Sequence, residues 1–338
     1  MAGHNAGDPA TPDIGRARQF LARQSAWRPL EAVPWLAAFA AIPLFGDSLF
    51  VGTQVVVLIL FALSLDVILG YAGILTLGHA AFFGIGAYTA GGLVVHARWL
   101  EPVSGLLAAG LCAALAGAVA GYILLRYQGL PLLMLTLAVG VMLGETANAL
   151  EKFTGGFDGM SGISVSPLLG RFANDMHGRN FYIYALTVLG AIFLVCRRVI
   201  HSPFGLSLRG VRENPARMPA IGCDILSRRV AIYTLSAFIA GLAGALFAQS
   251  NEFITIHVFS FLRSGTVLIV LVLGGTGRLY GAFLGGALYY LLEHKLAKIS
   301  PEFWELGVGL TLLGVVYFGG NGLLGIGDSL VRRVWRRP

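Results

Sequence analysis

The sequence predicts an all-α, polytopic membrane protein of about ten transmembrane helices, and three observations support this fold class. Hydrophobic residues make up 56% of the 338 positions and charged residues only 12%, whereas soluble domains carry about 25% charge. The apolar residues lie in long uninterrupted runs, and a run of about 20 residues spans a bilayer as an α-helix. The basic residues gather in alternate connections between these runs, as expected for membrane topology.

The apolar runs define the expected helices from the N-terminus onward. We expect transmembrane helices at residues 32–46, 49–69, 74–95, 103–125, 130–150, 181–200, 230–250, 259–275, 281–297 and 303–320. Two prolines interrupt the first run, and only residues 276–280 separate the eighth from the ninth, so these two are also consistent with one broken element. Together the helices form a predicted transmembrane domain at 30–328, between a cytoplasmic tail at 1–29 and a basic cytoplasmic tail at 329–338.

The distribution of Lys and Arg predicts the orientation of the chain. With the N-terminus inside, 17 of the 24 basic residues fall on the inner side and 7 on the outer side, so the positive-inside rule places both termini in the cytoplasm. Residues 151–180 then form a long outer connection rich in Gly, Ser and Asp, and residues 201–229 form a basic inner connection. Because the net charge of +7 resides in such connections, it indicates contact with membrane lipid rather than with nucleic acid.

No motif in the sequence predicts enzymatic activity. The three cysteines, Cys112, Cys196 and Cys223, have neither disulfide-framework nor metal-ligand spacing. The chain contains no Gly-x-Ser-x-Gly nucleophile motif, no His-Glu-x-x-His zinc motif and no phosphate-binding P-loop. We therefore predict a chain without catalytic residues, metal or cofactor, in which any ATP-driven step depends on ATP and Mg held by partner subunits.

The segment from Gly70 to Tyr88 is the most distinctive part of the sequence. It is rich in glycine and joins two apolar runs with almost no connection, so we expect unwound backbone at membrane depth. Such backbone occurs where it lines a cavity or is buried in protein, which makes this segment a candidate for the translocation pathway. Asp66 and His79 flank the bend and could meet across it. They form either a gate or proton relay or, the interpretation we favour, a structural hydrogen bond that fixes the bend.

Two further features carry polar residues next to apolar ones. Glu145 and Asn148 lie near the outer end of the fifth run, where a polar vestibule and simple hydrogen bonding between helices are equally consistent with the sequence. In the inner connection, Leu206, Leu208 and Val211 form an apolar side beside several arginines. This pattern is typical of a short amphipathic helix presented to a cytoplasmic partner, and also of a solvated basic loop that sets topology.

Several motifs, taken together, resemble the LivM-type permeases of branched-chain amino-acid ABC importers. The likeness covers about residues 45–330, and no single motif carries it. The motifs are GYAGILTLGHAAFFGIGAYTAG at 70–91, TGGFDGMSGI at 154–163, SPFGLSLRGVRENPARMPAIGCD at 202–224, AFIAGLAGALFA at 237–248, LVLGGTGRLYGAFLGGAL at 271–288 and GLLGI at 322–326.

The resemblance implies a type II ABC importer permease fold in a bacterial inner membrane. It implies a heterodimer with a second, LivH-type permease, two cytoplasmic ATPase subunits, and a periplasmic binding protein that delivers Leu, Ile or Val as the small-molecule substrate. By position it assigns Arg209, Arg212, Glu213, Asn214, Ala216 and Gly222 to an ATPase-coupling loop, and Tyr71, Gly73, Thr76, Gly78 and His79 to the translocation pathway. It assigns Gly155, Gly156, Asp158, Gly159, Ser161 and Gly162 to a periplasmic loop near the binding protein, and Asp66, Glu145 and Asn148 join the pathway candidates on their own chemistry.

The sequence departs from the family pattern in places, and these departures concern the substrate more than the architecture. Asp66, Ile74 and residues 278–282 differ from the commoner residues of the family, and residues 128–140 match it only loosely. A permease for urea, short amides or other amino acids is therefore an alternative. A secondary transporter with a proton relay, and a membrane scaffold or integral membrane enzyme, are the alternatives from other classes.

Overall fold

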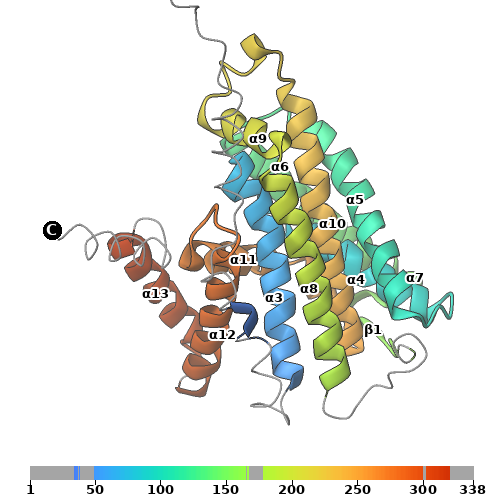
Figure 1. The fold of residues 1–338 in the computed structure, drawn as a ribbon. Helices are drawn as coiled ribbons and strands as arrows, with labels where there is room; N and C mark the ends of the chain where they lie inside the picture. Colours follow the sequence, from blue (N-terminus) through green and yellow to red (C-terminus); the bar gives the residue numbers. More distant parts are fainter. Residues whose placement is uncertain are drawn as a thin grey trace, which may run out of the picture.

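The computed structural model describes residues 34–36, 38, 49–164, 166, 178–299 and 302–319. The predicted terminal tails, most of the first expected span, part of the outer connection and the last of the motifs lie outside these residues. The described chain is built almost entirely of helices, as predicted (Figure 1). The α-helices are α3 (Leu49–Asp66), α4 (Ala80–Val95), α5 (Pro102–Leu124), α6 (Leu130–Ala149), α7 (Glu151–Thr154), α8 (Arg179–Ile200), α9 (Pro203–Glu213), α10 (Ile225–Asn251), α11 (Phe261–Gly274), α12 (Gly281–Ile299) and α13 (Trp304–Gly319).

Among the described residues, five helical segments are long and apolar enough to cross a bilayer. They are Leu49–Tyr71, Pro102–Leu124, Leu130–Ala149, Arg179–Ile200 and Ile225–Asn251. Helices α4, α11 and α13 are apolar but shorter than a full span. The chain is therefore a multi-pass membrane protein, while the count of about ten spans stays a prediction.

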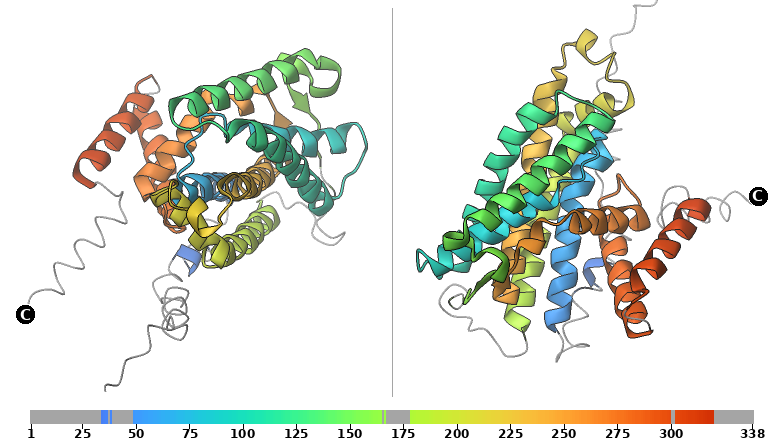
Figure 2. Two further views of the ribbon diagram at one scale, coloured as in Figure 1. Left: turned by 90° about the horizontal axis from the view of Figure 1, so that it is seen from above. Right: turned by 180° about the vertical axis from the view of Figure 1, so that it is seen from behind.

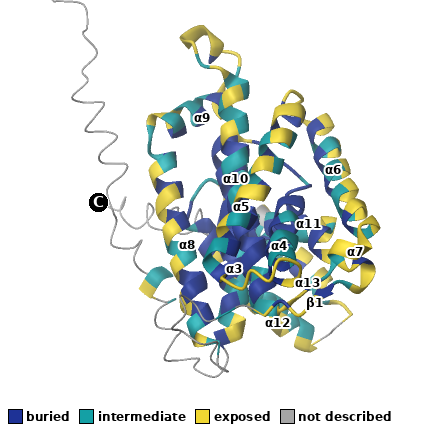
Figure 3. Ribbon diagram, turned by 90° about the vertical axis from the view of Figure 1, so that its right-hand side faces the viewer, coloured by how far each residue is buried: buried dark blue, intermediate teal, exposed yellow. Residues whose placement is uncertain are grey.

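Helices α3, α4, α5 and α10 form the centre of the molecule. Helix α10 packs along α5, α4 and α3, and Figure 3 shows the buried residues gathered on these central helices while α6 is exposed over much of its length. Small residues allow the backbones to approach closely. A Cβ on Gly244 would overlap the Phe83 carbonyl oxygen, and one on Gly86 would overlap the backbone of Gly241. Close helix packing of this kind takes the place of a hydrophobic driving force within lipid.

The connection between α3 and α4 differs from the expected pair of long helices. Helix α3 continues as one π-helical turn, Val67–Tyr71, and the chain then leaves the helix at Gly73, whose φ of +69° suits glycine. The next helix begins at Ala80 rather than at residue 74, so that boundary of the predicted third span is wrong. The positive φ of Gly73 ends the helix, and backbone N–H groups of Leu77 and Ala80 donate to side chains of other helices.

The C-terminal part of the described chain contains a helix that lies across the bundle. After α10 the chain turns back through β2 (Phe253–Ile254) and the 3₁₀ turn Ile256–Phe259 before α11 begins. Figure 2 shows α11 lying across the other helices rather than along them. With 14 residues it is shorter than the predicted span at 259–275. Helices α11 and α12 are separate helices that pack on each other, so residues 259–297 do not form one broken helix.

A short β-ladder is a small departure from the all-α prediction. Strand β1 (Met160–Ser161) pairs antiparallel with β2, which follows the last residue of α10. The backbone N–H of Ile163 adds a hydrogen bond to the Glu252 carbonyl oxygen at 3.4 Å. The ladder lies at the opposite end of the bundle from α9 (Figure 1). It ties the glycine-rich connection after α6 to the end of the central helix.

Candidate functional site

The non-helical segment at 73–79 is held inside the bundle by side-chain hydroxyls from other helices. The backbone N–H of Leu77 donates to Thr136 Oγ1 at 3.3 Å, and the N–H of the first residue of α4 donates to Ser264 Oγ at 2.9 Å. A Cβ on Gly78 would overlap the Thr136 carbonyl oxygen. Only glycine at position 78 therefore allows α6 to pack this closely against the segment. Because unwound backbone at membrane depth needs such partners, the segment is fixed by α6 and α11.

Asp66 and His79 flank this segment but have separate partners. The Nε2 atom of His79 lies 2.7 Å from Ser64 Oγ, and its ring stacks on Phe61 with the ring centroids 5.5 Å apart. The Oδ1 atom of Asp66 accepts a hydrogen bond of 2.7 Å from the backbone N–H of Gly277, which lies between α11 and α12. The expectation that the two side chains meet is therefore wrong. Their separate bonds favour the structural interpretation over a proton relay between them.

The end of α3 also contacts α9. The Arg212 guanidinium donates a hydrogen bond to the Gly70 carbonyl oxygen in the π-helical turn. The Arg209 guanidinium lies over the Tyr71 ring, 5.6 Å from its centroid. Three separate parts of the chain thus converge at this end of α3. The set of contacts, called the junction below, comprises Asp66, Gly70, Tyr71, Arg209, Arg212 and Gly277.

The inner connection contains the amphipathic helix that its pattern predicts. Helix α9 begins at the cap Ser202, whose Oγ accepts from the third residue beyond it, and its Leu208 and Val211 are buried against the bundle. Leu206 was expected on the same apolar side but is 40% exposed, because it lies on the flank of the helix. The predicted coupling residues turned outward are Arg212, Glu213, Asn214, Ala216 and Gly222, and Ile221 is exposed beside them.

The predicted residues of the outer connection form a compact set of turns. Gly155, Gly156, Gly159 and Gly162 all adopt positive φ, which explains why the motif is rich in glycine. Asp158 and Ser161 are exposed on these turns. The whole set lies beside the β-ladder, at the end of the bundle that α9 does not occupy.

The remaining predicted pathway residues are divided between the core and the surface. Thr76 is buried in the non-helical segment, and Gly73 is exposed near Arg212. Glu145 is exposed on α6 and Asn148 is half-buried on the same helix. The structure therefore does not bring Glu145 and Asn148 together with the junction.

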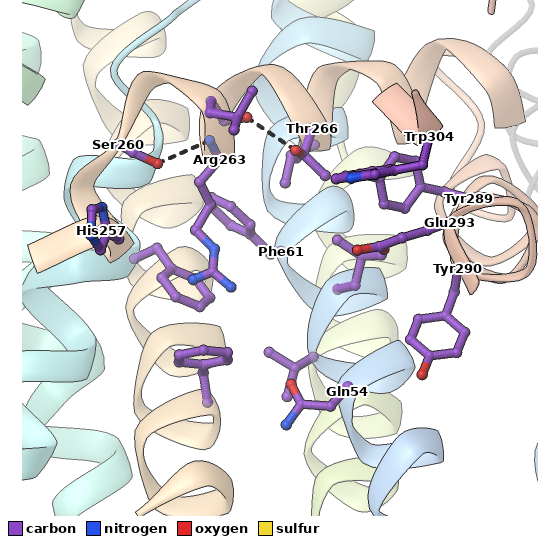
Figure 4. A pocket seen from close by; sticks show the side chains of 16 residues that line it. Gln54, Phe61, His257, Ser260, Arg263, Thr266, Tyr289, Tyr290, Glu293 and Trp304 are labelled. Carbon is purple, nitrogen blue, oxygen red and sulfur yellow. Dashed lines mark hydrogen bonds between the residues drawn. The ribbon is translucent and has the colours of Figure 1, made fainter. Parts of the chain in front are cut away.

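A cavity of about 470 Å³ lies beneath α11, and it is the second candidate functional region. Figure 4 shows side chains from α3, α11 and α12 pointing into it. Apolar and aromatic side chains line it together with charged and hydroxyl groups. We call this cavity the α11 pocket; its lining residues are Gln54, Val57, Leu58, Phe61, Phe83, Phe247, His257, Ser260, Leu262, Arg263, Thr266, Val267, Tyr289, Tyr290, Glu293 and Trp304.

Two charged residues of the α11 pocket are not singled out by the sequence analysis. Arg263 lies in the first turn of α11 and Glu293 lies in α12, both inside runs that we expect to be membrane helices. Ionisable residues within such runs are rare and serve as indicators of function, so this signal was present in the sequence.

The chain matches the model of the protein family described as "Branched-chain amino acid transport system / permease component" over residues 48–316. It is 29% identical, over 81% of this chain and 69% of the relative, to the high-affinity branched-chain amino acid transport system permease protein LivM of Escherichia coli. It is 28% identical, over 68% of this chain and 66% of the relative, to the autoinducer 2 import system permease protein LsrC of an Enterobacter strain. No solved structure matches the chain.

Proposed function

The chain belongs to the family of branched-chain amino acid transport permease components, and on this premise we propose that it carries Leu, Ile and Val across a bacterial inner membrane as part of an ATP-driven importer. It is a transport subunit and not an enzyme. The similarity to LivM over about four-fifths of the chain supports the substrate class. The relationship to LsrC means that family membership alone does not fix the substrate, and other amino acids, urea and short amides are the alternatives.

The proposed importer contains three kinds of partner. A second, LivH-type permease completes the membrane domain, two cytoplasmic ATPase subunits bind ATP and Mg, and a periplasmic binding protein delivers the substrate. In this assembly both termini are cytoplasmic, α9 faces the ATPases, and the turns beside the β-ladder face the binding protein. The basic composition of the 201–229 connection supports this orientation.

The junction is the observation that carries the mechanism. Helix α9 presents an exposed face outward while Arg212 donates to the Gly70 carbonyl oxygen at the π-helical end of α3. A displacement of α9 by an ATPase subunit is therefore transmitted to the end of a transmembrane helix. Through Asp66 and Gly277, the same end is bonded to the connection between α11 and α12. The junction thus couples ATP-driven movement to two parts of the membrane domain.

The docking role of α9 can be tested with outward-facing residues. Ile221 is 75% exposed and Glu213 is exposed, so Ile221→Asp and Glu213→Arg are expected to change the chain's own stability by only about 0.5 kcal/mol. We expect both variants to fold but to lose the ATPase subunits on co-purification, and with them leucine uptake into membrane vesicles. Retention of the ATPase subunits and of uptake in both variants would contradict the docking role.

A further inference from the structure

We infer that the α11 pocket is a binding site for a zwitterionic amino acid within the translocation pathway, with Arg263 receiving the carboxylate and Glu293 the ammonium group. This inference rests on the proposed function and deepens it, because it assigns substrate contacts to particular residues of the permease. A cavity of about 470 Å³ falls within the range of about 300–1,000 Å³ that is usual for small-molecule pockets.

Arg263 is held in a geometry that leaves its hydrogen-bond donors available. Its guanidinium carbon lies 4.7 Å from the Phe83 ring centroid and 4.4 Å from the Phe247 ring centroid. Aromatic rings take the faces of a guanidinium and leave its N–H groups free at the edge. Glu293 attracts this guanidinium electrostatically, but in the part of the chain that the structure describes no carboxylate forms an ion pair with it at 4 Å or less. The planar donor fork of arginine fits a carboxylate group in two parallel hydrogen bonds.

Glu293 supplies the opposite charge from another helix. It projects from α12 into the cavity, and Figure 4 shows its carboxylate directed toward the space that Arg263 enters from α11. A charge at membrane depth needs a partner or water. Arg263 and His294 attract the charge of Glu293, but no described residue forms an ion pair with it at 4 Å or less. Two opposite charges on two sides of one cavity match the two charges of an amino acid.

The remaining wall suits an aliphatic side chain. Val57 and Leu58 of α3 and Leu262 and Val267 of α11 line the cavity together with the Phe61 ring. A branched aliphatic group would remove apolar surface from water here, at a gain of about 25 cal/mol per Å² buried. The pocket thus combines two opposite charges with apolar surface, as leucine does.

A second cavity of about 500 Å³ provides a contrast within the same molecule. It lies between α3, α8 and α12, and no Asp, Glu, Lys or Arg of the described chain lines it. Val51, Val55, Leu186 and Leu291 are among its lining residues. An acyl chain or another helix fits such a wall. The charges of the α11 pocket are therefore a distinct feature and not a general property of gaps in this bundle.

The first experiment measures transport by the complete importer in proteoliposomes, with leucine delivered by the binding protein. Replacing Arg263 by Gln removes the charge at similar length, and we expect leucine uptake per ATP hydrolysed to fall about tenfold or more, as for loss of a charged hydrogen bond. Arg263→Lys, which keeps a cation over the two rings, is expected to fall less. Glu293→Gln is expected to reduce uptake several-fold. Arg126→Gln is the matched control, since Arg126 is exposed and lies over the Tyr122 ring, away from the pocket.

The second experiment detects occupancy of the pocket directly. Thr266→Cys, in a chain whose three native cysteines are replaced, reports access of a maleimide to the cavity. We expect leucine to slow labelling of the cysteine. The leucine analogue without the carboxylate (an amine) and the analogue without the ammonium group (an acid) are each expected to protect the cysteine far less. If Arg263→Gln does not assemble, Glu293→Gln and this labelling decide the question.

The possible outcomes separate the two proposals. A wild-type importer that does not take up leucine overturns the proposed function and the inference with it. A wild-type importer that does, combined with Arg263→Gln and Glu293→Gln variants that match it, overturns the pocket assignment alone. Equal protection of Thr266→Cys by leucine, the amine and the acid also overturns it, because apolar filling would then explain occupancy.

Discussion

The junction and the α11 pocket lie at the two ends of α11, and they treat charge in opposite ways. At the junction, Asp66 bonds a backbone N–H and Arg212 bonds a backbone carbonyl oxygen of the chain itself. In the pocket, Arg263 and Glu293 project into a cavity without an ion pair between described residues. A charged group that bonds the backbone, as Asp66 does through Oδ1 while its Oδ2 is buried without a hydrogen-bond partner, helps to fix a conformation, whereas a charge that faces a cavity is available to a ligand. The comparison assigns a structural role to the junction and a binding role to the α11 pocket.

The largest expected effect comes from overfilling the junction. A Cβ on Gly70 would lie 2.6 Å from the Gly277 Cα and would overlap Asp66 Oδ1, so Gly70→Ala cannot keep the Asp66–Gly277 hydrogen bond. We expect a loss of about 2–4 kcal/mol in the free energy of unfolding, measured by thermal unfolding of the detergent-purified importer. Gly265→Ala on α11 is the control, because a Cβ there meets nothing within 4 Å and a gain of about 0.5–1 kcal/mol is expected. Equal losses of unfolding free energy in Gly70→Ala and Gly265→Ala would show that the loss is not specific to the junction.

A smaller effect is expected from the carboxylate itself. Asp66→Ala leaves the buried Gly277 N–H without its acceptor, at a cost of about 1–3 kcal/mol in the free energy of unfolding. Asp66→Asn keeps an acceptor oxygen and is expected to retain most of the stability and of the leucine uptake. The measurement is thermal unfolding together with uptake. Should Asp66→Asn fold normally and yet abolish uptake, the charge would have a role in transport, and the proton-coupled alternative would gain support.

How far the sequence predicts these two regions depends on the type of signal. Long apolar runs predict the membrane class and most helices, because about 20 apolar residues satisfy a bilayer wherever they pack. The glycine-rich segment after Gly70 and the amphipathic pattern around Leu208 predict local features that the structure contains. These signals are local, and each can be read from residues that are neighbours in the chain.

The pairing of residues across the fold could not be predicted in the same way. Asp66 and Gly277 are 211 positions apart, and Arg212 and Gly70 are 142 apart. The sequence offered His79 as the partner of Asp66 because it is near in the chain, while the folded bundle brings Gly277 closer. Arg263 and Glu293 were detectable as charges in apolar runs, but their common cavity follows only from the crossing of α11 over α3.

The smallest effect on stability, and the sharpest test of the comparison, is expected at Arg212. Its side chain is exposed and makes one hydrogen bond to the Gly70 carbonyl oxygen, so Arg212→Gln is expected to cost about 1 kcal/mol or less in the free energy of unfolding. Uptake of leucine per ATP hydrolysed is nevertheless expected to fall several-fold, because α9 then moves without pulling the end of α3. Arg198→Gln, at an exposed position near the end of α8, is the matched control. If Arg212→Gln transports leucine with the wild-type ratio of uptake to hydrolysis, the junction fixes the shape of the bundle but does not transmit movement, and transmission must run through the buried contacts of Leu208 and Val211 instead.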